Sequence, residues 1–166
     1  QHLNPHNGEA VKEVDGHEAA ITCLKISYSS VKIVSGDSDG IVKLWDFHGL
    51  ELLVGLRAHI GACNCLAFSP RSSLVLTGGA DKVVKVWETR EMKLIRKFDG
   101  HKGEITSLAC SLFPLNSSIN SLWDPQEATR TEGDFRVVAG STDRSLRVWT
   151  FTGTEELFYK RCMTTK

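Results

Sequence analysis

Short runs of alternating apolar and polar residues, separated by turn-forming residues, fill most of the chain. β-branched and aromatic residues dominate these runs, for example at 42–45 and 84–87, and such residues favour strands. Residues 37–40, 79–82 and 141–144 have the composition of tight turns between neighbouring strands. No stretch of helical length shows an apolar period of 3.6 residues. The pattern therefore predicts an all-β protein.

The strand-like runs belong to an internal repeat that is marked by tryptophan. Trp45, Trp87 and Trp149 each end a segment of apolar, basic and apolar residues, which read Val-Lys-Leu-Trp, Val-Lys-Val-Trp and Leu-Arg-Val-Trp. The first two tryptophans are 42 residues apart, whereas 62 residues separate the second from the third. A fixed spacing of this length predicts a repeat architecture whose third unit carries an insertion.

Three further polar residues keep a constant place in each unit. A histidine lies near the start, an aspartate lies six residues before the tryptophan, and a hydroxyl residue lies four residues before the aspartate. Arranged by unit, they are His17, Ser35 and Asp39; His59, Thr77 and Asp81; and His101 and Asp143, with Ala139 in the place of the hydroxyl residue.

A four-stranded unit of about 42 residues, with a Gly-His pair near its start and a Trp-Asp pair near its end, resembles the WD-repeat family of β-propellers. The resemblance covers residues 10–160. Departures are few: Ala58 replaces the glycine before the histidine, and Glu88 and Thr150 replace the aspartate after the tryptophan. The resemblance implies a partial β-propeller of three four-stranded antiparallel blades plus one orphan N-terminal strand, at residues 10–14.

The repeat also divides the chain. The expected segments are an N-terminal extension with the last strand of a preceding blade at 1–16, WD repeat 1 at 17–58, WD repeat 2 at 59–100, and WD repeat 3 at 101–166 with an inserted loop near 112–134. Propellers of this kind use about 4–8 blades. We therefore expect the chain to be a fragment of a longer protein.

The resemblance gives the repeated polar residues a structural role. In the family, histidine, a hydroxyl residue, aspartate and tryptophan form a hydrogen-bonded tetrad. The tetrads implied for this chain are His17, Ser35, Asp39 and Trp45; His59, Thr77, Asp81 and Trp87; and an incomplete set of His101, Asp143 and Trp149. A Ser–His–Asp catalytic triad is the alternative, but a triad occurs once per site, whereas this set recurs at the same offsets. We expect no catalytic residue.

Composition excludes several classes of protein. Twenty Lys and Arg residues balance 20 Asp and Glu residues, which argues against nucleic-acid binding and against attachment to a membrane surface. The five cysteines contain no Cys-x-x-Cys pair, so neither a disulfide framework nor a metal site is predicted. No cofactor is expected. Reduced cysteines in a globular chain are typical of an intracellular protein, cytoplasmic or nuclear.

The insertion in the third unit has the composition of an acidic loop. Residues 112–134 hold four acidic residues, one arginine and Trp123, with the proline and serine content of a loop. We expect this loop to leave the face opposite the three histidines, because antiparallel strands alternate in direction. Two interpretations stay open, an acidic docking segment that contacts a partner through Trp123 and a tolerated surface insertion.

The family resemblance implies a non-enzymatic protein–protein interaction scaffold that organises a multiprotein complex, with other proteins or peptides as partners. Apolar faces on the terminal blades would add self-association. A second hypothesis is a substrate receptor of a cullin–RING ubiquitin ligase, because Trp87-Glu88-Thr89-Arg90 resembles the box ending in Trp-Asp-x-Arg of such receptors. Glu88 and Arg90 would then contact the adaptor. A third is an enzyme whose site lies on missing blades.

Overall fold

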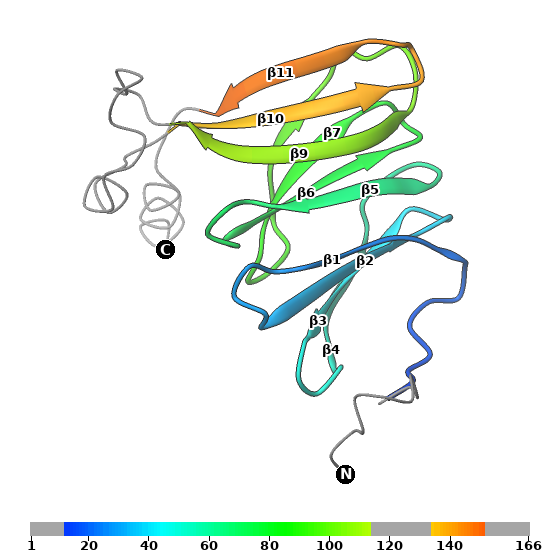
Figure 1. Cartoon of the computed structure of the whole chain (residues 1–166). Coiled ribbons are helices and arrows are strands. Elements are labelled where there is room, and N and C mark those ends of the chain that lie inside the picture. The colour runs from blue at the N-terminus through cyan, green and yellow to red at the C-terminus, as the bar shows by residue number, and fades with distance from the viewer. Residues whose placement is uncertain (1–11, 114–133, 152–166) are drawn as a thin grey trace, which may run out of the picture.

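The computed structural model describes residues 12–113 and 134–151, which form three antiparallel sheets stacked one after another (Figure 1). The first sheet contains β1 (Ile21–Ile26), β2 (Lys32–Asp37), β3 (Ile41–Asp46) and β4 (Leu52–Arg57). The second contains β5 (Cys63–Phe68), β6 (Leu74–Gly79), β7 (Val84–Glu88) and β8 (Leu94–Phe98). In both sheets the strands pair in sequence order. The expectation of an all-β fold is confirmed for the described residues.

The third sheet has three strands among the described residues. They are β9 (Ile105–Phe113), β10 (Asp134–Ser141) and β11 (Leu146–Phe151), with β10 in the centre. The fourth strand expected after Trp149 lies outside the described residues, as does most of the insertion, including Trp123. The last described pair before that insertion, Phe113 with Asp134, lies at the end of β9 that is remote from His101.

The orphan N-terminal strand is not found in the part of it that the structure describes. Residues 12–14 have no strand conformation, and residues 10 and 11 lie outside the described range. A strand is held by hydrogen bonds to a neighbour, and none of the described strands pairs with this segment. Lys12 instead donates a side-chain hydrogen bond to the carbonyl of Gly49.

The hydrophobic core lies between the sheets. One cluster joins the first two sheets, and a second joins the second and third, so the middle sheet is buried on both faces. Strand β6 shows this most clearly, because all six of its residues are buried. In β3, by contrast, only Val42 and Leu44 are buried, because that strand has a neighbouring sheet on one face alone.

Close backbone contacts fix how one sheet meets the next. Gly40 adopts a φ of 80°, and a Cβ atom at this position would lie 2.3 Å from the carbonyl oxygen of Gly61. Its own carbonyl accepts hydrogen bonds from the N–H groups of Ala58 (2.8 Å) and His59 (3.2 Å). Only glycine fits such a conformation and approach without strain. The turn after β2 thereby holds the histidine loop that opens the next unit.

Candidate functional site

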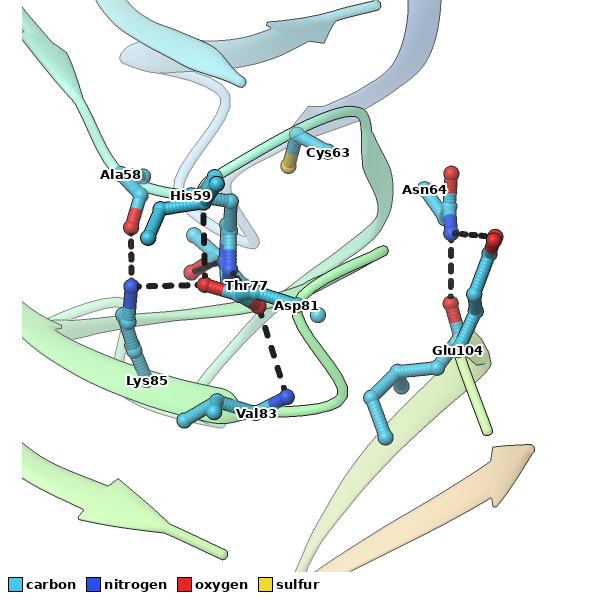
Figure 2. Close-up of polar contacts among 12 residues, drawn as sticks. Ala58, His59, Cys63, Asn64, Thr77, Asp81, Val83, Lys85 and Glu104 are labelled. Carbon is cyan, nitrogen blue, oxygen red and sulfur yellow. Dashed lines mark hydrogen bonds and ion pairs between the residues drawn. The ribbon is translucent and has the colours of Figure 1, made fainter. Parts of the chain in front are cut away.

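The repeated polar residues of the second unit form one connected network (Figure 2). The indole N–H of Trp87 donates to the hydroxyl of Thr77 at 2.9 Å. Thr77 Oγ1 lies 2.7 Å from Nε2 of His59, whose Nδ1 lies 2.7 Å from the carboxylate of Asp81. Lys85 closes the network, because its ammonium group donates to Asp81 at 3.0 Å and to the carbonyl of Ala58. The network therefore ties two strands to the loop before β5.

The chemistry of the groups fixes the protons of this network. An indole N–H can only donate and an ionised carboxylate can only accept. In a neutral imidazole, Nδ1 therefore carries the proton that Asp81 accepts, and Nε2 accepts the hydroxyl proton of Thr77. Burial lowers the pKa of His59, although Asp81 works in the opposite direction. Burial acts to raise the pKa of Asp81, but hydrogen bonds from His59 and Lys85 outweigh it and lower the pKa.

The first unit builds the same network with a different aspartate. His17 Nδ1 lies 2.7 Å from Asp37 Oδ2, Nε2 lies 2.6 Å from Ser35 Oγ, and the indole of Trp45 donates to Ser35 at 2.8 Å. The expectation that Asp39 would be the carboxylate of this tetrad is wrong. Asp39 is exposed, whereas Asp37 is buried at the end of β2.

Local hydrogen bonds explain why Asp37 takes the position. Its Oδ1 accepts from the N–H groups of Asp39 (3.0 Å) and Ile41 (2.8 Å), so one carboxylate both caps the turn and holds the imidazole. Burial acts to raise the pKa of Asp37, yet the hydrogen bonds from His17 and these two N–H groups lower it. In the second unit the equivalent residue is Gly79, where a Cβ atom would lie 2.4 Å from the His59 ring. A side chain there is incompatible with the geometry of that unit.

The third unit has a broken network. His101 Nδ1 lies 3.0 Å from Asp143 Oδ2, but Nε2 of His101 is buried without a hydrogen-bond partner among the described residues. The cause is Ala139, which stands where the other units have a hydroxyl group. Ser145, which the sequence reasoning missed, joins instead: its Oγ lies 2.6 Å from Asp143 Oδ1 and 3.2 Å from His101 Nδ1. The hydrogen bond from Ser145 is the main cause of the lowered pKa of Asp143.

These networks are built to hold structure. The hydroxyl groups of Ser35 and Thr77 are buried, and each is engaged by an indole and an imidazole. A nucleophile needs access to its substrate, which neither group has. Within the described ranges, no group of three or more His, Cys, Asp or Glu side chains could hold a metal ion, and no helix is long and apolar enough to span a bilayer.

Of the proposed adaptor-contact residues, Glu88 ends β7 and Arg90 lies in the turn between β7 and β8. The carboxylate of Glu88 accepts hydrogen bonds from the N–H groups of Arg90 (2.7 Å) and Glu91 (3.0 Å). Thr89 is buried and bonds to the carbonyl of Ser73 at 2.9 Å, whereas Arg90 is exposed. The turn is therefore rigid and presents the arginine outwards.

Comparison with known sequences connects this architecture to one family. The sequence matches the WD domain, G-beta repeat family over residues 8–46, 50–88 and 92–150. It is also 42% identical over 40 residues to eukaryotic translation initiation factor 3 subunit I of Drosophila grimshawi, and equally to that of Drosophila pseudoobscura pseudoobscura. Each match covers 24% of this chain and 12% of the relative.

Solved structures share the fold. The crystal structure of the RRP9 WD40 repeats superimposes with a TM-score of 0.64 at 22% identity, covering 83% of this chain and 40% of that one. The computationally designed Ika8 protein gives 0.64 at 30% identity, covering 87% and 37%. The chain thus spans well under half of these structures. Because the family match extends over most of the sequence and the sheets recur as blades, the chain belongs to the WD domain, G-beta repeat family.

Proposed function

We propose that this chain is a non-enzymatic scaffold that binds other proteins through the loops of its blades and takes part in a multiprotein complex. We also propose the repeat boundaries 17–58, 59–100 and 101–166, and self-association through the terminal blades. One observation carries the binding role: the reactive side chains are buried in networks that brace the histidine loops. The match to a protein whose name marks it as a subunit of a larger factor supports the same role.

We place the partner-binding surface at an exposed isoleucine in the loop before β5. Ile60 follows His59 directly, and its side chain is 82% exposed. Its N–H group lies 3.4 Å from Asp81 Oδ2, so the network anchors the backbone that presents it. We take Ile60 as the candidate anchor, because an apolar side chain whose backbone is already held in place loses little conformational freedom when a partner covers it.

The test is quantitative affinity capture from a cell lysate. Ile60→Asp should abolish capture of proteins that the wild-type chain retains, because the charge removes the apolar anchor. Leu53→Asp is the matched control, since Leu53 is an exposed apolar residue on the outer strand β4. The same loss of captured proteins with both variants would contradict the proposed loop surface. Unchanged capture with both variants would contradict it as well.

A second candidate is the substrate receptor of a cullin–RING ligase, which the exposed Arg90 on its rigid turn favours. The purified adaptor propeller should bind the wild-type chain and lose binding with Arg90→Ala. Arg71→Ala serves as control, because Arg71 is an exposed arginine in the turn between β5 and β6, which opens on the same side of the blade. Absence of adaptor binding by the wild-type chain would reject this candidate.

A further inference from the structure

Two cysteine thiols face each other at the contact between the first and second sheets. Cys23 in β1 and Cys63 in β5 have their Sγ atoms 3.8 Å apart, and Cys23 Sγ also lies 3.1 Å from the carbonyl oxygen of Cys63. Both side chains belong to the hydrophobic cluster that joins these two sheets. All eight strands of the two sheets lie in the described part of the chain, so this pairing of thiols does not depend on where the chain begins or ends.

The surroundings hold the two sulfur atoms together. Gly36 pairs with Cys23 in the first sheet, and a Cβ atom at Gly36 would lie 2.9 Å from Cys23 Sγ and 2.7 Å from Cys63 Sγ. The glycine therefore leaves the room that both thiols occupy. Thr22, which precedes Cys23, donates a hydrogen bond across the contact to the carbonyl of Cys63. This bond holds the backbone of β5 against β1.

The contact between the second and third sheets has the same construction with one thiol fewer. Cys65 occupies in β5 the place that Cys23 occupies in β1, and Ile105 begins β9 as Cys63 begins β5. A Cβ atom at Gly78 would lie 2.6 Å from Cγ2 of Ile105 and 2.7 Å from Cys65 Sγ. Of the two contacts that the structure describes, only the first therefore brings two thiols together.

We propose that Cys23 and Cys63 form a redox modification site, at which a hydroperoxide converts the two thiols into a reversible disulfide between the first two blades. The sulfur atoms of a disulfide lie about 2.05 Å apart, so the two side chains would have to close a gap of less than about 2 Å. Rotation about the two Cα–Cβ bonds moves the sulfur atoms over such a distance. The proposal is independent of the proposed binding role, because it concerns only the contact between two blades.

The two thiols differ in the way that this reaction requires. The hydrogen bond with Cys63 is the main cause of the lowered pKa of Cys23. The same bond, followed by burial, raises the pKa of Cys63. Because the thiolate is the nucleophile, Cys23 reacts first. Its thiolate attacks one oxygen of hydrogen peroxide, the O–O bond breaks, and hydroxide leaves; the sulfur loses two electrons to the peroxide and becomes a sulfenic acid.

Cys63 completes the reaction. The sulfenic acid of Cys23 is neutral, so the thiolate that kept the proton on Cys63 is no longer present. Cys63 Sγ then attacks the sulfur of Cys23: an S–S bond forms, the S–O bond breaks, and the departing hydroxide takes the proton of Cys63 and becomes water. In the net reaction, two thiols and one hydrogen peroxide give one disulfide and two molecules of water.

The disulfide would tie the first blade covalently to the second. The chain between the two cysteines contains β2, β3 and β4, and closing it into a loop reduces the conformational freedom of the unfolded chain. The oxidised protein should therefore unfold at a higher temperature than the reduced protein. A thiol reductant should reverse the change by exchange with the disulfide.

The experiment uses the 166-residue chain with the substitutions Cys110→Ser and Cys162→Ser, which leave three thiols. The reduced protein is treated with hydrogen peroxide, the remaining thiols are alkylated, and peptide mass spectrometry without reduction maps the cross-links. We expect the disulfide between Cys23 and Cys63 in most molecules. The thermal unfolding midpoint should rise by at least about 5 °C, and dithiothreitol should return it to its starting value.

Cys65→Ser is the matched control, because it removes the thiol that meets isoleucine, and it should keep both the cross-link and the higher midpoint. Cys63→Ile introduces the residue that β9 has in the same place. It should lose both effects and leave Cys23 as a sulfenic acid that dimedone traps. Circular dichroism verifies that each variant is folded, and the cross-link map of the parent chain does not depend on either variant.

Three results would overturn the proposal. The first is oxidation of Cys23 beyond the sulfenic acid in the parent chain without a cross-link to Cys63. The second is a disulfide that joins Cys65 to either of the other two cysteines. The third is a disulfide between Cys23 and Cys63 that fails to raise the midpoint, since the two sulfur atoms would then meet only through distortion of the blades.

Discussion

The imidazole of His17 bonds to Asp37 at 2.7 Å, and the imidazole of His59 bonds to Asp81 at the same distance, although the two aspartates occupy different places in the repeat. Asp37 lies 20 residues after its histidine, whereas Asp81 lies 22 residues after. The geometry is kept while the residue that supplies the carboxylate changes. Each of the two units therefore keeps a carboxylate beside the imidazole, although the number of residues between the histidine and the aspartate differs.

Because Asp37 and not Asp39 holds the imidazole, alanine substitutions of these two aspartates should have different effects on stability. Asp37→Ala should lower the free energy of unfolding by about 1–3 kcal/mol, because it leaves His17 and two backbone N–H groups without their acceptor. Asp39→Ala should change it by less than about 0.5 kcal/mol, since the side chain of Asp39 is exposed. Chemical denaturation of both variants measures the difference. A larger effect at Asp39 would contradict the observed network.

The broken network of the third unit can be repaired. Ala139→Thr should raise the free energy of unfolding relative to Ala139→Val by about 1 kcal/mol, because the hydroxyl gives the buried Nε2 of His101 a partner. Threonine and valine have the same shape, so the pair isolates the oxygen from the added volume. Thr77 shows that a threonine fits the equivalent place in the second unit. Equal stability of the two variants would show that the orphaned nitrogen carries no cost.

Much of the fold could be predicted from the sequence because the same pattern of residues recurs in three units, so each unit supports the interpretation of the others. The tryptophan spacing and the alternation in runs such as 42–45 predict strands and sheet order without any knowledge of long-range contacts. The spacing alone could not predict that Asp37, and not Asp39, bonds to the imidazole of His17. It depends on which carboxylate ends up buried beside the imidazole, and both residues suit a turn equally well.

Two other features depend on three-dimensional packing. Ser145 follows the turn after β10 and has no counterpart in the repeated pattern, so only its distance from His101 reveals its part in the third network. The sequence predicts a strand at 10–14, but its described part, residues 12–14, is not a strand, because a strand forms only where a partner supplies hydrogen bonds. In both cases the local sequence is compatible with several structures, and the neighbours decide between them.

The free energy of unfolding should fall in two steps as the pH decreases. The pKa of His59 is lowered from 6.5 in the folded chain, so below about pH 6.5 the unfolded chain binds a proton that folded His59 does not, and stability falls. The pKa values of Asp37 and Asp81 are lowered from 3.8. Stability from these carboxylates is therefore complete above that pH and is lost as the pH falls through their folded pKa values.

Denaturation midpoints across this pH range measure both steps. His59→Gln should remove the His59 contribution to the upper step, whereas His48→Gln should leave it unchanged, because His48 is exposed. Constant stability of the wild-type chain between about pH 7 and pH 5 would contradict the first step.

Glycine at 36 is required by the contact between the first two sheets. A Cβ atom there would lie 2.7 Å from Cys63 Sγ and 2.9 Å from Cys23 Sγ. Gly36→Ala should therefore lower the free energy of unfolding by about 1–3 kcal/mol through overpacking. Gly55→Ala is the control, since its nearest neighbour, Cγ of Lys43, lies 3.5 Å away and the φ of Gly55 is not positive. Thermal unfolding should show Gly55→Ala at or above wild-type stability, and a similar loss in both variants would refute the steric cause.

The same interface predicts an order of thiol reactivity. The Sγ atoms of Cys23 and Cys63 lie 3.8 Å apart. Their hydrogen bond lowers the pKa of Cys23 and, together with burial, raises the pKa of Cys63; burial raises the pKa of Cys65 to about 12. Since the thiolate is the reactive form, iodoacetamide should modify Cys23 well before the other two, as peptide mass spectrometry can show. Unfolding should remove the difference, and labelling of Cys63 in the folded chain at the rate of Cys23 would mean that the sheets separate more readily than their packing indicates.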